Sequence, residues 1–81
     1  MEEYLMTARS VTQAQRMMQA LSQHGIRAAM GRSPVGLTGS GYVLRMQGQR
    51  AEEAAALLRG IGLAPLRIYV RDGSGYSEVE L

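Results

Sequence analysis

Apolar and polar positions alternate in four short segments of the chain and recur at helical spacing in two longer ones. The alternating segments, residues 3–8, 26–30, 42–47 and 66–71, predict strands, because successive side chains of a strand point to opposite faces. The spacing of apolar residues over 11–24 and 49–60 predicts two amphipathic helices. The buried stripes expected on these helices are Val11, Ala14, Met17, Met18 and Leu21 on the first, and Ala54, Leu57, Leu58 and Ile61 on the second.

Capping signals mark both ends of the first predicted helix and the C-terminal end of the second. Ser10 is a good N-cap, and Gln13 three residues later completes a capping-box pattern. Gly25 is the expected C′ residue of the first helix, and Gly60 and Gly62 end the second. A faint internal repeat follows, since Leu21…Gly25-Ile26 recurs as Leu58…Gly62-Leu63, each time where a helix ends and a strand follows.

Two βαβ halves of this size are typical of the ferredoxin-like βαββαβ fold of the α+β class. Right-handed crossovers then place both helices on one face of a four-stranded antiparallel sheet. We expect a single domain over residues 1–72 and a flexible C-terminal tail over 73–81, which begins Gly-Ser-Gly. The expected core includes Met18, Leu21, Leu44, Leu58 and Ile68, and the expected open sheet face carries Leu5, Thr7, Arg27, Ala29, Val43, Arg45, Arg67 and Tyr69.

Composition removes several kinds of chemistry. The 81 residues contain no Cys and one His, so thiol chemistry, disulfides and a metal-ligand pattern are not expected, and neither is a cofactor. No apolar run approaches the roughly 20 residues of a membrane span. With no export signal we expect a cytoplasmic protein. All nine cationic residues are Arg, and the formal net charge of +2 allows an anionic ligand without demanding nucleic acid.

The segment 31–41 is the most distinctive stretch, with Pro34 and four glycines. Successive backbone N–H groups in glycine-rich turns can form an anion-binding nest, and positively charged residues flank this one. The alternative is a long connection between the two halves. The candidate ligand- or partner-binding residues are Arg32, Pro34, Gly39, Ser40, Gly41 and Arg45.

Residues 40–45, Ser-Gly-Tyr-Val-Leu-Arg, resemble the Cys-Gly-plus-strand segment of a small bacterial domain family described as selenium/sulfur carrier-like. Members are about this length and carry a Pro-containing loop before the Cys-Gly. The resemblance covers roughly residues 3–70 and implies delivery of sulfur or selenium on the cysteine, with sulfur- or selenium-transfer proteins as partners. Ser40 stands where the family has Cys, and a serine hydroxyl cannot form a persulfide. Either the site was altered, or this branch kept the loop and lost the carrier step.

The expected function is therefore that of a non-enzymatic module that binds a protein partner or a small anionic ligand through residues 34–42. Ser40 as a nucleophile would need an adjacent base, and His24 is better placed to complement the C-terminus of the first helix. A second hypothesis is a structural or regulatory domain that forms a homodimer through its open sheet face. Nucleic-acid binding is not expected, because the central strands offer that face no aromatic residue for base stacking.

Overall fold

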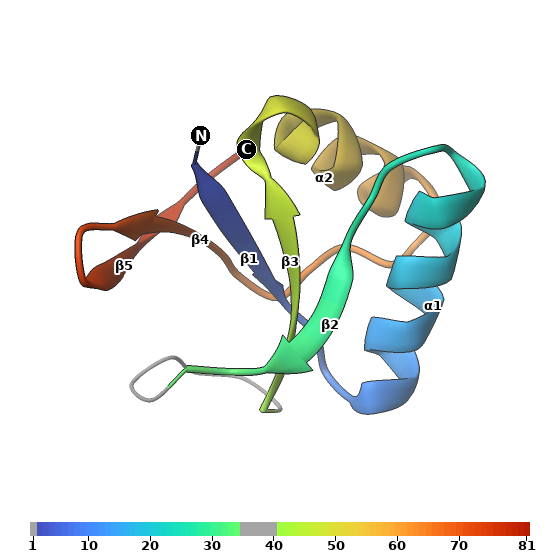
Figure 1. The fold of residues 1–81 in the computed structure, drawn as a ribbon. Helices are drawn as coiled ribbons and strands as arrows, with labels where there is room; N and C mark the ends of the chain where they lie inside the picture. Colours follow the sequence, from blue (N-terminus) through green and yellow to red (C-terminus); the bar gives the residue numbers. More distant parts are fainter. Residues whose placement is uncertain (1, 35–40) are drawn as a thin grey trace.

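The chain alternates strands and helices in the predicted βαββαβ order and adds one more strand at the end (Figure 1). A computed structural model describes residues 2–34 and 41–81. The elements are β1 (Glu3–Thr7), α1 (Val11–Gln23), β2 (Ala29–Arg32), β3 (Tyr42–Gln47), the 3-10 turn η1 (Gly48–Arg50), α2 (Ala51–Gly60), β4 (Ile68–Asp72) and β5 (Gly75–Val79).

The strands form one antiparallel sheet in the order β2-β3-β1-β4-β5. The prediction of four strands is wrong, because residues 73–81, expected as a flexible tail, contain β5. This strand pairs with β4 from Ile68–Val79 to Asp72–Gly75, across a two-residue turn. Gly73 opens that turn with φ of 62°, and a type II′ hairpin places glycine at this position. The Gly-Ser dipeptide is thus a hairpin turn.

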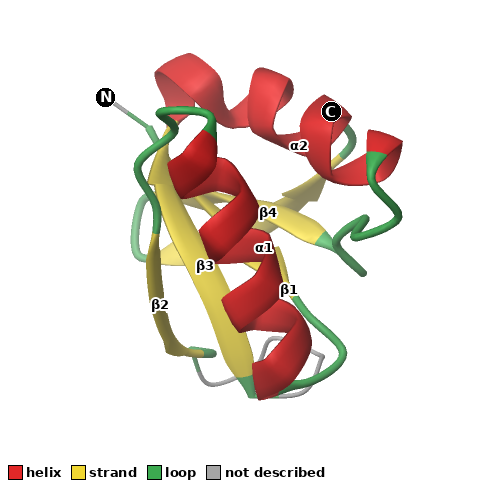
Figure 2. Ribbon diagram, turned by 90° about the vertical axis from the view of Figure 1, so that its right-hand side faces the viewer, coloured by secondary structure: helices red, strands yellow, loops and turns green. Residues whose placement is uncertain are grey.

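Both helices pack against the same face of the sheet, as predicted (Figure 2). Their buried residues join Met6, Leu44 and Ile68 of the sheet in a single core. Of the predicted core residues, Leu21, Leu44, Leu58 and Ile68 are buried. Met18 is only half-buried, and Val11 and Ile61 are exposed, so the helical stripes are narrower than predicted. On α2, Ala51 and Ala55 are buried as well, although the predicted stripe does not include them.

The two helix ends confirm the internal repeat. Gly25 and Gly62 both have positive φ, 73° and 78°, a conformation that glycine adopts without steric cost. Ile26 N–H donates to the carbonyl of Leu21 at 2.8 Å, and Leu63 N–H donates to the carbonyl of Leu58 at the same distance. Each half of the chain therefore leaves its helix through the same hydrogen-bonded turn before it enters the next strand.

The N-terminus of α1 is capped as predicted, with one difference. Ser10 Oγ accepts a hydrogen bond from the Gln13 N–H at 3.1 Å. The Gln13 side chain reaches back to the N–H of Arg9 rather than to that of Ser10. The Gln13 side chain thus accepts from the residue before the N-cap instead of from the N-cap itself, and it satisfies a backbone donor outside the helix.

Candidate functional site

The two arginines predicted to flank the loop lie on opposite faces of the sheet. Arg32 ends β2 opposite Tyr42, and its guanidinium carbon lies 5.8 Å from the centre of the Tyr42 ring. Arg45 lies opposite Ala29, and its guanidinium packs beside Gly31. Since positions 42 and 45 of one strand face opposite ways, the two positive charges do not converge on one ligand.

The base of the loop is closed by a hydrogen bond from Ser33 N–H to the carbonyl of Gly41, 2.8 Å long. Pro34 is half-buried, and Gly41 is exposed with φ of 90°. The other two predicted site residues, Gly39 and Ser40, lie outside the described residues. The role of the loop itself therefore stays a prediction.

Arg45 instead lines a pocket of about 410 Å³ where β2 and β3 separate. The ladder between these strands ends at the Ala29–Arg45 pair, although the sequence predicts a strand from residue 26. Ile26 cannot extend the ladder, because its N–H already bonds to Leu21 at the helix end. Residues 25–29 thus form one wall of the pocket, while residues 45–47, 49 and 50 form the other and Glu3 contributes an acidic group.

Three arginines line this pocket, Arg27, Arg45 and Arg50. Arg50 is paired with Glu53, with Nε–Oε1 at 3.0 Å and Nη2–Oε2 at 3.1 Å. This hydrogen-bonded contact raises the pKa of Arg50 and lowers the pKa of Glu53. Arg27 and Arg45 form no ion pair within the described part of the chain.

The acid in the pocket is already engaged elsewhere. Glu3 Oε1 lies 3.8 Å from Nη1 of Arg71, on the neighbouring strand β4. The pocket therefore has a positive balance, and its two unpaired guanidinium groups can each bind a carboxylate or phosphate oxygen pair. The sequence predicts only Arg45 for the site. The sequence places Arg27 on the open sheet face and gives no signal for Arg50, because the pocket depends on where β2 and β3 separate.

The sheet face opposite the helices is more buried than the sequence predicts. Leu5 and Val43 are fully buried and Tyr69 is 8% exposed, and Tyr76 of β5 packs against this group. The homodimer through this face stays a prediction, but the apolar side chains that motivated it are buried within one chain.

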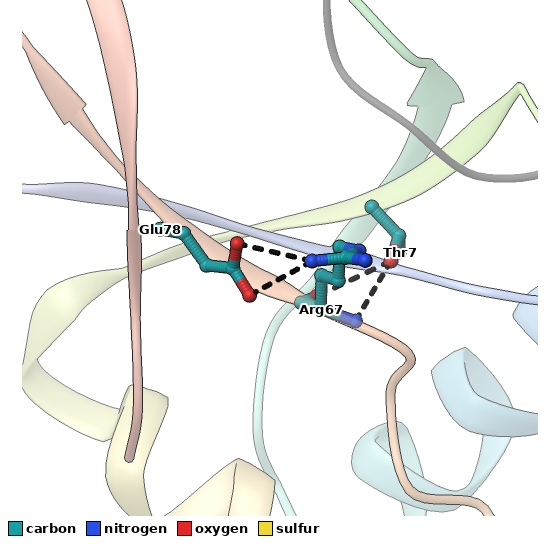
Figure 3. Close-up of polar contacts among 3 residues, drawn as sticks. All are labelled: Thr7, Arg67 and Glu78. Carbon is teal, nitrogen blue, oxygen red and sulfur yellow. Dashed lines mark hydrogen bonds and ion pairs between the residues drawn. The ribbon is translucent and has the colours of Figure 1, made fainter.

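Polar contacts continue along the same face at the end of β1 (Figure 3). Thr7 Oγ1 accepts a hydrogen bond from Arg67 N–H at 2.9 Å and donates one to the Arg67 carbonyl at 3.3 Å. The Arg67 guanidinium in turn pairs with Glu78 of β5 at 3.1 Å. A hydroxyl and an ion pair thus tie the segment before β4 to strands on both sides.

The remaining candidate chemistry resolves into structural roles. His24 is the C-cap residue of α1, and its Nδ1 lies 3.0 Å from the carbonyl oxygen of Ala20, which confirms the capping role. Within residues 2–34 and 41–81, no group of three or more His, Asp or Glu side chains could hold a metal ion. No helix in the described ranges is long and apolar enough to cross a membrane. No family model, curated protein or solved structure matches the chain.

Proposed function

We propose that the domain is a non-enzymatic binding module that takes a small anionic ligand in the pocket lined by Arg27, Arg45 and Arg50. The observation that carries this proposal is that Arg27 and Arg45 line one pocket and neither pairs with a carboxylate of the described chain. Guanidinium groups present paired donors that match carboxylate and phosphate oxygens.

The size of the pocket favours a small molecule. Its 410 Å³ falls within the ordinary range for small-molecule sites, about 300–1,000 Å³. Gln47 and Gln49 add amide donors and acceptors to the lining. Because both unpaired arginines are exposed, screening by salt weakens their attraction for an anion. Binding should therefore weaken steeply with ionic strength.

The loop 34–42 and the resemblance to the carrier family are part of the same proposal. Arg45 belongs both to the pocket and to the residues predicted to act with the loop 34–42. Sulfur- or selenium-transfer proteins are the partners that the resemblance implies, and their binding is part of the proposal.

Titration of the ¹⁵N-labelled protein with pyrophosphate tests the pocket. We expect shifts at residues 27–29 and 45–50, and an affinity at least about tenfold lower in Arg45→Ala and in Arg27→Ala, a loss of about 1.4 kcal/mol. Arg59→Ala is the matched control, because Arg59 is an exposed arginine that does not line this pocket. Equal affinity in all three variants would refute the pocket as the site. Shifts confined to the amides of Ser33, Gly41 and Tyr42 would assign anion binding to the loop instead.

A further inference from the structure

A second depression lies on the other side of the same segment, between α1 and the chain that leads into β2. It has a volume of about 680 Å³. Met18, Ile26 and Ala28 give it apolar walls, while Gln19, Ser22 and Gln23 form its polar part. The half-buried Met18 is the predicted core residue that the fold leaves at this surface. In Figure 2, α1 runs alongside β2 and β3 on this side of the molecule.

The groove runs beside an unpaired sheet edge. β2 is the first strand in the sheet order, so its outer side has no neighbouring strand among the described residues. Arg27 and Ala28, just before β2, take part in no backbone hydrogen bond within the described ranges. Free backbone donors and acceptors along an edge form a template for an added strand.

The elements around the groove, α1, β2 and β3, carry arginines and no acidic residues. Residues 4–51, which include α1, β2 and β3, contain no Asp or Glu, and they carry the arginines Arg9, Arg16, Arg27, Arg32, Arg45 and Arg50. Arg27 and Arg32 are exposed at the two ends of the edge segment. The groove lining itself includes Arg27 and no acid, and the nearby acids Glu3 and Glu53 are each paired with another arginine, so a strand that approaches this edge is favoured when it carries negative charge.

We propose that the groove between α1 and β2 docks an extended acidic segment of another protein, which adds to β2 as a sixth strand. Alternate side chains of the bound segment are apolar and enter the groove against Met18, Ile26 and Ala28. The intervening side chains are carboxylates within reach of Arg27, which lines the groove and is exposed. Backbone hydrogen bonds supply general affinity, and the groove and the arginines select the pattern.

A second copy of the chain fits this groove poorly. Pairing β2 with β2 of another copy brings Arg27 and Arg32 of both chains together, and like charges at a strand pair are destabilising. The acidic edge strand of the chain is β5, with Glu78 in it and Glu80 just after it. Its apolar neighbours Val79 and Leu81 already pack against their own core, so they cannot fill the groove of another copy.

The test uses a fluorescein-labelled octapeptide of alternating glutamate and leucine, and fluorescence anisotropy as the readout. We expect saturable binding that the corresponding lysine–leucine octapeptide does not show. Arg27→Glu should weaken binding at least about tenfold, as should Met18→Glu, while Arg59→Glu serves as the charge-matched control. Arg27 is exposed, so its substitution tests the proposal even if Met18→Glu does not fold. No binding at about 1 mM protein, equal binding of both peptides, or unchanged affinity in Arg27→Glu would overturn the proposal.

Amide hydrogen exchange then distinguishes strand addition from surface attraction. Peptide should slow exchange of backbone amides within residues 27–32 and leave those of β5 unchanged. Protection at β5 alone would overturn the site, and a self-associated protein that the peptide dissociates would assign the groove to a second copy. Met18 lines this groove but not the anion pocket, so Met18→Gln should weaken peptide binding and leave pyrophosphate affinity unchanged. The anion proposal and the peptide proposal can therefore fail separately.

Discussion

The guanidinium of Arg50 donates a hydrogen bond of 2.7 Å from Nη1 to the carbonyl oxygen of Gly25. This contact joins the start of α2 to the turn that ends α1, across 25 positions of the sequence. Glu53 holds the same guanidinium from the other side, with both carboxylate oxygens. The wall of the anion pocket is thus fixed by a side chain of the opposite half of the chain.

The pKa of Glu53 reports on this arrangement. Hydrogen bonding to Arg50 is the main cause of its lowered pKa, with the Arg50 charge next. We expect the Glu53 titration, followed by carboxyl ¹³C NMR, to move toward the ordinary glutamate value in Arg50→Gln. A folded-state pKa below the unfolded one means that the contact stabilises the fold above the ordinary carboxyl pKa. That stabilisation is lost as the pH falls through the folded pKa. An unchanged Glu53 titration in Arg50→Gln would show that the pair does not form.

The hydroxyl of Thr7 is a buried structural group. Thr7 is fully buried, and its Oγ1 accepts from the Arg67 N–H. We expect Thr7→Val to cost about 1–3 kcal/mol, because the substitution keeps the shape but leaves that N–H without its partner. Thr7→Ser keeps the hydroxyl and should cost less. Chemical denaturation of the three proteins makes the comparison, and a valine variant as stable as the serine variant would contradict the role of this hydrogen bond.

Leu58 is a large apolar residue of α2 that the sequence and the structure both place in the core. It is fully buried, whereas Ile61, three residues later, is 49% exposed. Leu58→Ala should therefore lower the free energy of unfolding by about 2–5 kcal/mol. Ile61→Ala, at a surface position, should change it by no more than about 0.5 kcal/mol. Similar losses in both variants would mean that the helix is rotated relative to the sheet.

Position 40 offers a test of the carrier resemblance. Ser40→Cys should introduce a thiol that accepts sulfur, because a thiolate is the nucleophile that a serine hydroxyl cannot replace. The variant is incubated with a cysteine desulfurase and cysteine, and a sulfur adduct on residue 40 is sought by mass spectrometry. Ser74→Cys is the matched control, since Ser74 is exposed in the β4–β5 turn. Equal modification of both variants would remove the carrier ancestry as a guide to this loop.

Local patterns predicted the order of the elements well. Period-two alternation identified β1 and β3, and Ser10 and Gly25 marked both ends of α1. Each of these signals is local, because it involves only residues within one turn or one strand. The alternation predicts that β2 starts at residue 26, whereas the strand is Ala29–Arg32, because the Ile26 N–H is already bonded at the end of α1.

The pocket could be predicted only in part, because it depends on contacts between distant segments. The sequence indicates Arg45 because it follows the loop, but the strand register places Arg45 and Arg32 on opposite faces of the sheet. Arg50 belongs to the pocket through its reach to Gly25. The absence of acids from residues 4–51 is a signal in the sequence that would have pointed to this side of the molecule.

The strand β5 allows a direct test of the corrected fold. Val79 packs against the main core, and Tyr76 packs against the cluster of Leu5, Val43 and Tyr69. A chain truncated after Asp72 should therefore lose at least about 2 kcal/mol of stability in chemical denaturation, comparable to the burial of one apolar side chain. A flexible tail could be removed without any change in the denaturation midpoint. If the truncated chain does not fold, Val79→Asp and Glu80→Gln make the same comparison in the full chain. Glu80 is exposed, so only the Val79 substitution should destabilise the protein, and equal stability of the two variants would show that β5 is not part of the packed domain.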